Sequence, residues 1–288
     1  MCRFVAYSGL PLLLADLLYK PSDSLILQSY HARERREPLN GDGFGLGWYV
    51  PEIDDTPCVI RSITPAWSNS NLRHLSFKTQ ASRLFAHVRA ASPGTGVSES
   101  NTHPFNYGRF MWMHNGMVAD FQRIKRRLRH GLKDEFYNMI AGTTDSEHAF
   151  ALFLNELPDL NAVSAEEMRK TLVWTIGRLN EVSREAGITT PSFYNFAVTN
   201  GEATVVSRYC SDQNTEGASL HYARGHFLES LPDGKCDIHS VSPTEKASAV
   251  IVASEKLTDE RSNWCDVPDN HTVTVFLDLT VKLERIEL

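Results

Sequence analysis

The order of the predicted elements places this chain in the α+β class. Runs rich in apolar and β-branched residues come first, helical segments follow, and further β-like runs complete the 288 residues. Strands and helices in separate blocks are typical of layered α+β domains, whereas strict alternation is typical of parallel βαβ units. The sequence shows no repeat and no linker rich in Pro, Gly or Ser, so we expect a single domain spanning residues 2–288.

The N-terminal block predicts four strands and a short helix. Cys2–Ser8 is an apolar run ended by Gly9, and Pro11–Tyr19 has helical spacing. In Asn40–Tyr49, glycine alternates with bulky apolar residues, which favours a turn entering a buried strand whose glycines permit close backbone approach. Two further strands are predicted, at Ser82–Ala90 and Phe110–His114.

The middle of the chain is helical and the remainder returns to strands. Ala119–Leu132 carries Phe121, Ile124 and Leu128 on one face. Asp145–Leu157 is a strongly apolar helix that either Thr144 or Asp145 can cap, and Ala165–Ala186 follows a capping box formed by Ser164 and Glu167. Later strands are predicted at Ser192–Thr199, Ala203–Tyr209, Ala218–Ala223, Ala247–Ala253 and Val273–Leu279.

Composition excludes several classes of protein. The hydrophobic fraction of 42% supports a sizeable core, and the formal charge of −6 argues against a general affinity for nucleic acid or anionic lipid. No apolar run approaches the roughly 20 residues that span a bilayer, and the first residues do not resemble a secretory signal. We therefore expect a soluble, intracellular, cytoplasmic protein that binds neither nucleic acid nor membrane.

The five cysteines suggest neither disulfides nor a metal site. Their number is odd, they are widely spaced, and no pair has the close spacing of zinc ligands. Cys2 differs from the others because removal of Met1 would place its thiol beside a free α-amine. An α-amine has a pKa of about 7.7–8.0, so it can take the thiol proton and later protonate a leaving amine. The alternative is that Cys2 merely follows the initiator methionine.

A thiol that attacks a carboxamide needs donors for the oxyanion that forms. His114-Asn115-Gly116 ends an apolar strand, where Asn115 can offer its side-chain N–H and Gly116 its backbone N–H. An Asn-Gly dipeptide is also a common hairpin turn, and spacing alone favours that alternative.

Three residues predict a pocket for the α-amino-acid end of glutamate. Arg89 follows the apolar run Leu84–Val88, and its planar fork suits a carboxylate. Ser92 could add a hydroxyl to the same carboxylate, while Asp145 could receive an ammonium group. The simpler alternatives are a strand-end arginine paired with a surface acid and a helix-capping aspartate.

The order of these motifs resembles that of the class II glutamine amidotransferases, which are N-terminal-nucleophile hydrolases. The matching segments are Cys2, Asn40-Gly41-Asp42-Gly43, His87-Val88-Arg89, His114-Asn115-Gly116 and Thr144-Asp145-Ser146-Glu147. Further strings resemble a stand-alone subfamily that includes bacterial amidotransferases and a fungal glutathione-degrading subunit, among them Met1-Cys2-Arg3-Phe4, Asn101-Thr102-His103-Pro104-Phe105 and Ser254-Glu255. The resemblance extends from Cys2 to about Trp264.

The resemblance implies a four-layer αββα sandwich and a set of site roles. Cys2 would be the nucleophile, with Asn115 and Gly116 as oxyanion donors. Arg89 and Ser92 would hold the substrate α-carboxylate, and Asp145 its α-ammonium, with no metal or organic cofactor.

Two departures from the family pattern affect the pocket rim. The arginine motif continues as Ala90-Ala91-Ser92-Pro93 rather than Trp-Ala-Thr-His, and Ser254-Glu255 is followed by Lys256 rather than proline. The sequence therefore does not predict what replaces the contacts of the missing tryptophan and histidine. It also does not predict the path of the 254–256 loop.

The motifs occupy nearly all of the sequence and leave no room for a synthetase domain. We expect an enzyme that hydrolyses the γ-glutamyl amide of glutamine or of a small γ-glutamyl peptide such as glutathione through an N-terminal cysteine thioester. The alternatives are a non-catalytic or partner-dependent subunit that binds γ-glutamyl compounds, and an ammonia donor to a separate synthase subunit. His87, His103 and His114 could line the pocket.

Overall fold

Two antiparallel sheets form the centre of the computed structural model, which describes residues 2–34, 39–91, 95–228, 236–242 and 244–288. In the described residues, the first sheet has the strand order β10-β9-β11-β1-β4-β2-β3, with β12 beside β9, and the second has the order β14-β13-β8-β7-β6-β5. The strands of the first sheet are β1 (Arg3–Leu13), β2 (Phe44–Trp48), β3 (Cys58–Ser62), β4 (Gln80–Val88), β9 (His221–Leu228), β10 (Asp237–Ser240), β11 (Ala249–Ala253) and β12 (Cys265–Asp266). Those of the second are β5 (Phe105–Tyr107), β6 (Phe110–Met117), β7 (Phe193–Thr199), β8 (Thr204–Arg208), β13 (His271–Val275) and β14 (Val281–Arg285).

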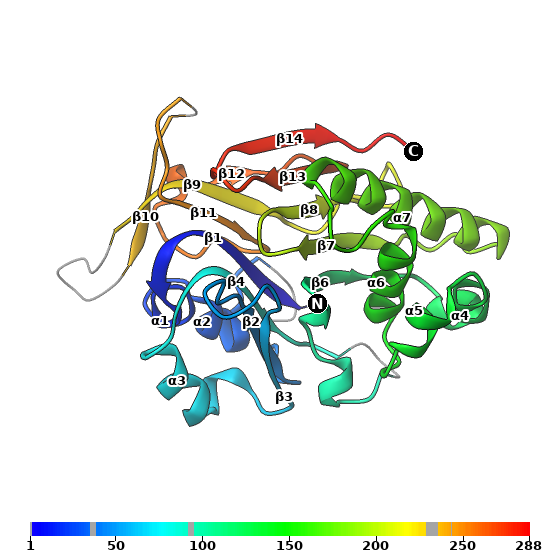
Figure 1. The fold of residues 1–288 in the computed structure, drawn as a ribbon, viewed down its shortest axis with the longest axis horizontal. Coiled ribbons are helices and arrows are strands. Elements are labelled where there is room, and N and C mark those ends of the chain that lie inside the picture. Colours follow the sequence, from blue (N-terminus) through cyan, green and yellow to red (C-terminus); the bar gives the residue numbers. More distant parts are fainter. Residues whose placement is uncertain (1, 35–38, 92–94, 229–235, 243) are drawn as a thin grey trace.

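Helices cover the outer faces of the two sheets (Figure 1). The first sheet packs against α1 (Leu14–Leu18), α2 (Leu25–His31) and α3 (Ser70–Ser76). The second packs against α4 (Phe121–His130), α5 (Asp134–Asn138), α6 (Asp145–Glu156) and α7 (Ala165–Glu185). Short 3-10 turns occupy Ala66–Ser68, Glu99–Asn101 and Arg261–Asn263. The predicted α+β class is confirmed, and the layers are α, β, β and α.

A third apolar cluster fills the space between the sheets. Phe4 of β1 and Phe85 of β4 meet Met111 and Met113 of β6 there. Because side chains alternate along a strand, the intervening residues face the helices. Val5 accordingly belongs to the core beneath α1 and α2.

The glycines of β2 allow the two sheets to approach closely, as the sequence predicts. A Cβ atom on Gly45 would lie 2.1 Å from the carbonyl oxygen of His103, and one on Gly47 would lie 2.2 Å from Sδ of Met111. Any larger residue at these positions would push the second sheet away.

The predicted helices in the middle of the chain are confirmed. Phe121, Ile124 and Leu128 of α4 are buried, and the capping box of Ser164 and Glu167 is present at the start of α7. For α6 the structure selects Thr144 as the cap, because its hydroxyl accepts from the backbone N–H of Glu147.

Some predicted boundaries are wrong. The first strand does not end at Gly9, because it resumes pairing with β4 after an irregularity between Ser8 and Leu12. The predicted helix from Pro11 is therefore confined to α1. The strand predicted to run to Leu279 ends at Val275, and the one predicted from Ala218 begins at His221.

No helix among the described residues is both long enough and apolar enough to cross a bilayer.

Candidate active site

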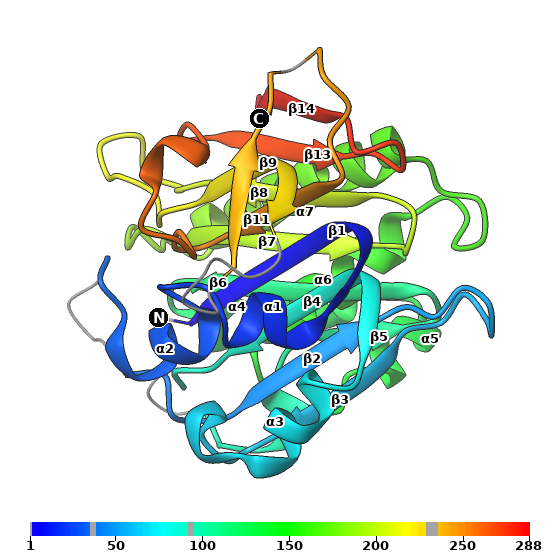
Figure 2. The ribbon, with the colours of Figure 1, turned by 90° about the vertical axis from the view of Figure 1, so that its left-hand side faces the viewer.

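Strand alternation brings Cys2 to the inner face of the first sheet, at the start of β1. Phe4 and Ala6 of β1 lie in the inter-sheet core, so Cys2, two residues before Phe4, lies on the same face. Arg3 pairs with Val88 at the end of β4, which places the start of β1 beside the segment that follows β4. Figure 2 shows this start of β1, next to the N label, close to α2 and β6.

The thiol of Cys2 contacts the residue that follows Arg89. The backbone N–H of Ala90 donates to Sγ of Cys2 at 3.4 Å. Burial raises the pKa of the Cys2 thiol, while the Ala90 N–H and the positive charges of Arg89 and Arg3 act to lower it. Cys2 is partly exposed, and its hydrogen bond from Ala90 and the charges of Arg89 and Arg3 oppose the effect of burial on the thiol pKa.

Arg89 is a buried cation with a free donor. Its side chain is 3% exposed, and Nη2 donates to the carbonyl oxygen of Gly96 at 3.1 Å and weakly to the hydroxyl of Thr95. Nη1 is buried and has no hydrogen-bond partner among the described residues. Burial lowers the pKa of Arg89, opposed by the nearby Asp42 and Cys2. The surface ion pair offered as the simpler alternative is absent from the described residues.

Asp42 is bonded to the main chain at the end of β4, and no bond to the Arg89 guanidinium is found among the described residues. Its Oδ2 accepts from the backbone N–H of Ala91 at 2.8 Å, and its own N–H donates to the carbonyl oxygen of Arg89. The Asn-Gly-Asp-Gly motif therefore fixes the backbone around Arg89. Ser92, predicted to assist with the substrate carboxylate, lies outside the described residues.

Asn115 lies inside β6 and not in a hairpin turn. It pairs with Asn195 of β7, so the turn alternative is wrong. The odd-numbered Met111 and Met113 face the inter-sheet space, and Asn115 continues that row. Asn115 has no solvent-exposed surface, and neither polar atom of its side chain has a partner among the described residues. A buried amide without partners is costly unless something binds it.

Gly116 is required by the packing of β6 against β7. A Cβ atom there would lie 2.0 Å from the carbonyl oxygen of Phe193 and 2.6 Å from Nε2 of His114. The nearest obstruction to a side chain at position 116 is therefore the neighbouring strand β7.

Asp145 occupies the first turn of α6 and is oriented by the end of β6. Its Oδ2 accepts from the backbone N–H of Val118 at 2.7 Å, and its Oδ1 accepts from the N–H of Ser146. The side chain is half-buried. Since Thr144 caps the helix, capping does not account for Asp145, and its carboxylate remains close to the strand that carries Asn115 and Gly116.

The three candidate histidines are buried and neutral. The rings of His87 and His103 lie 4.3 Å apart, and His87 Nε2 is 3.3 Å from the carbonyl oxygen of His114. Burial lowers the pKa of His87 to about 3 and that of His103 well below its usual value. The pKa of His114 is also lowered by burial, against the opposing charge of Asp145. These rings add no positive charge near Arg89 at neutral pH.

Two residues near Cys2 were not predicted to belong to the site. Arg3 donates to the carbonyl oxygen of Cys2 at 3.0 Å, and Glu255 forms an ion pair with Arg3. The signals available in the sequence were an arginine directly after Cys2 and the Ser254-Glu255 string. No group of three or more His, Cys, Asp or Glu side chains in the described ranges could hold a metal ion.

The family model for class-II glutamine amidotransferases matches residues 13–282. The chain belongs to the class II glutamine amidotransferases. Among similar members of the family is the "Probable glutamine amidotransferase DUG3" of Saccharomyces cerevisiae, 41% identical over 96% of this chain and 82% of the yeast protein. The "Gamma-glutamyl-hercynylcysteine sulfoxide hydrolase" of Mycobacterium tuberculosis is 31% identical over 96% of this chain and 93% of its own length.

Solved structures of the family share this fold. A glutamine aminotransferase class-II domain protein from Silicibacter pomeroyi covers all of both chains, with a TM-score of 0.67 and 24% identity. Glutamine phosphoribosylpyrophosphate amidotransferase from Bacillus subtilis covers this whole chain with half of its own, with a TM-score of 0.61 and 15% identity. The expected four-layer αββα sandwich is thereby confirmed.

Proposed function

We propose that this protein is a γ-glutamyl amidohydrolase that uses Cys2 as an N-terminal nucleophile and needs no metal or organic cofactor. The observation that carries the proposal is the Cys2 thiol beside Arg89, whose buried Nη1 lacks a partner among the described residues. An unpaired guanidinium nitrogen next to a nucleophile suits a substrate that brings its own carboxylate.

The glutamyl half of the substrate is held at its α-amino-acid end. Arg89 donates to the α-carboxylate, to which Ser92 adds a hydroxyl, and Asp145 accepts from the α-ammonium. Binding both charged groups fixes the δ-carbonyl carbon close to the sulfur, which lowers the entropic part of the barrier.

The chemistry proceeds through a thioester. After removal of Met1, the α-amine of Cys2 takes the thiol proton, and the sulfur attacks the δ-carbonyl carbon. The oxyanion accepts hydrogen bonds from Asn115 Nδ2 and the Gly116 N–H, and the resulting ammonium group protonates the departing amine. Water then attacks the glutamyl thioester, releasing glutamate and restoring the thiol.

We favour a small γ-glutamyl peptide as substrate over glutamine. The name of the mycobacterial relative specifies hydrolysis of a γ-glutamyl conjugate, whereas the yeast relative is named an amidotransferase. We propose that residues 2–288 form one domain; under the alternative of ammonia donation, a separate synthase subunit would receive the ammonia.

The test is release of glutamate from glutamine and from glutathione, each measured with the full chain and with Cys2→Ala. We expect turnover with at least one substrate and its near-complete loss in Cys2→Ala. Equal turnover in the two proteins would overturn the mechanism. Binding of γ-glutamyl compounds without any turnover would favour the non-catalytic or partner-dependent alternative.

A further inference from the structure

Glu255, two residues beyond the end of β11, has a carboxylate that is buried against the start of β1. Its Oε2 accepts from Nε of Arg3 at 2.7 Å, and each side chain is 1% exposed. Arg3 also donates from Nη1 to the carbonyl oxygen of Cys2 at 3.0 Å. One guanidinium group therefore connects a buried carboxylate to the main chain of the proposed nucleophile.

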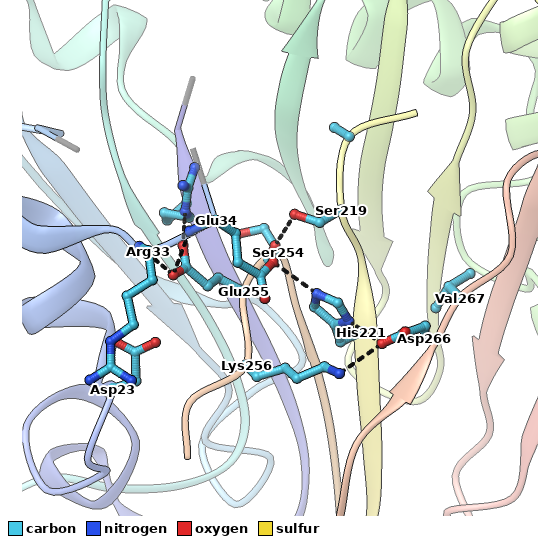
Figure 3. A network of polar contacts seen from close by, with 12 residues as sticks. Asp23, Arg33, Glu34, Ser219, His221, Ser254, Glu255, Lys256, Asp266 and Val267 are labelled. Carbon is cyan, nitrogen blue, oxygen red and sulfur yellow. Dashed lines mark hydrogen bonds and ion pairs between the residues drawn. The ribbon is translucent and has the colours of Figure 1, made fainter. Parts of the chain in front are cut away.

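The other oxygen of Glu255 is bonded to the segment after α2. Oε1 accepts from the backbone N–H groups of Arg33 at 2.6 Å and of Glu34 at 3.2 Å. Figure 3 shows the Glu255 carboxylate against these two residues, with His221 and Asp266 farther along the same polar network. Within the described ranges, every hydrogen bond recorded for this carboxylate comes from an N–H donor.

The preceding residue fixes Glu255 relative to β1. The hydroxyl of Ser254 accepts from the N–H of Phe4 at 3.0 Å, and the Ser254 N–H donates to the carbonyl oxygen of Phe4 at 3.1 Å. Ser219 in turn donates to the carbonyl oxygen of Ser254. The string Ser254-Glu255 is thus bonded to the two residues that follow Cys2.

We propose that Glu255 is a positioning residue that acts through Arg3 to hold the main chain of Cys2, so that its amine and thiol face the substrate; this rests on the proposed function. Cys2 precedes the first paired residue of β1, and chain termini fray unless they are tied down. A nucleophile displaced by about 1 Å can lose about 100-fold in rate. The two-armed guanidinium group of Arg3 restrains the main chain of Cys2, and Glu255 orients that guanidinium group.

The charge of Arg3 supports a second effect on the same residue. Burial raises the pKa of the Cys2 thiol, and Arg3 is one of the groups that act to lower it. Displacing the guanidinium should therefore reduce the thiolate fraction as well as the order of the main chain.

Two substitutions separate positioning from mere stability. Arg3→Lys keeps a positive charge for Glu255 but replaces the two-armed fork by a single ammonium group. In the folded protein both carboxylate oxygens of Glu255 accept hydrogen bonds from N–H donors. Glu255→Gln keeps the side-chain volume, but its NH2 group faces one of these N–H donors in either orientation of the amide.

A matched control is Arg109, which directly precedes β6. Arg109 also makes a two-armed contact, from Nε to the carbonyl oxygen of Asn200 and from Nη2 to the carboxylate of Glu202. Arg109→Lys removes the same kind of fork from a partly buried arginine away from Cys2.

The experiment measures kcat and KM for the γ-glutamyl substrate, the midpoint of thermal unfolding, and the pH dependence of iodoacetamide alkylation of the Cys2 peptide by mass spectrometry. We expect Arg3→Lys and Glu255→Gln to lose about tenfold or more in kcat, with KM changed by less than about threefold. Their alkylation profiles should shift to higher pH, whereas Arg109→Lys should change neither kcat nor the profile.

Folded variants with the wild-type kcat and alkylation profile would overturn the positioning role and leave Glu255 a structural residue. If the wild-type protein shows no turnover, the proposed function fails, but the alkylation profiles still decide whether Glu255 acts on Cys2.

Discussion

At the residue scale, two of the predicted site residues carry buried polar groups without partners among the described residues. In the described part of the chain these include Nη1 of Arg89 and both polar atoms of the Asn115 side chain. Unpaired buried donors destabilise a folded protein by about 1–3 kcal/mol each. Their presence on residues predicted to bind a γ-glutamyl substrate is the physical reason for assigning a substrate to this site.

The amide of Asn115 provides the first prediction. Asn115→Ala should lower kcat by about 10²–10³-fold, because one donor to the oxyanion is lost. Steady-state assay of glutamate release measures the effect, and KM should change little. A fall of less than about threefold in a folded variant would mean that Asn115 is not an oxyanion donor.

The planar guanidinium group of Arg89 provides the second prediction. Arg89→Lys retains the charge but loses the planar, two-bond grip on a carboxylate. We therefore expect KM for the γ-glutamyl substrate to rise by about 10–100-fold, with a smaller change in kcat. An unchanged KM would refute the carboxylate role.

At the element scale, long-range pairing overrides local turn preference. Asn115-Gly116 has the composition of a type I′ turn, yet it continues β6 because Asn195 and Tyr194 of β7 pair with it. The first strand likewise passes Gly9, because Leu12 and Leu13 regain pairing with β4. Neither partner can be identified from the local sequence.

The elements that the sequence predicted well carry local signals. The apolar face of α4 and the capping box of α7 are encoded within a few residues of one another. The strands β3, β5, β10, β12 and β14 and the helices α2, α3 and α5 were not predicted, because the formation of these short elements depends on neighbours distant in the chain.

The tight packing of β6 against β7 gives the third prediction. Gly116→Ala should destabilise the protein by about 1–3 kcal/mol or more, because the new methyl group meets the carbonyl oxygen of Phe193. Gly131→Ala is the matched control, since its Cβ would lie 3.8 Å from the nearest atom. Urea unfolding compares the two variants, and equal midpoints would contradict the packing described for Gly116.

At the scale of the whole molecule, the candidate site lies where both sheets and the first turn of α6 meet. The first sheet supplies Cys2 and the end of β4, while the second supplies Asn115 and Gly116. Sequence order identified these candidates through a family resemblance. It could not show that Arg3 and Glu255, which are 252 residues apart, form a buried ion pair beside Cys2.

Buried neutral histidines give the whole molecule an acid-sensitive stability, which is the fourth prediction. Burial lowers the pKa of His148 to about 4, from a usual value of about 6.5. Between about pH 6.5 and pH 4, the unfolded chain therefore binds a proton at His148 that the folded protein does not bind. This contribution to stability is fully present above pH 6.5 and is lost as the pH falls towards 4.

His148→Gln should flatten the dependence of the unfolding free energy on pH between about 6.5 and 4, by at most about 1.4 kcal/mol per pH unit. Urea unfolding at several pH values measures the slope. His148 is buried in α6 and belongs to no proposed catalytic group, so activity at pH 7.5 should be retained. Identical slopes in the two proteins would contradict a neutral, buried His148.

The central claim is that a processed N-terminal cysteine faces a pocket for a glutamyl group. The most direct measurement is mass spectrometry of the protein after treatment with a chloroketone analogue of glutamine, with and without excess glutamate. We expect a single adduct on an N-terminal peptide that begins at Cys2, and protection of that peptide by glutamate. An adduct on another cysteine, or labelling of Cys2 that glutamate does not slow, would contradict it.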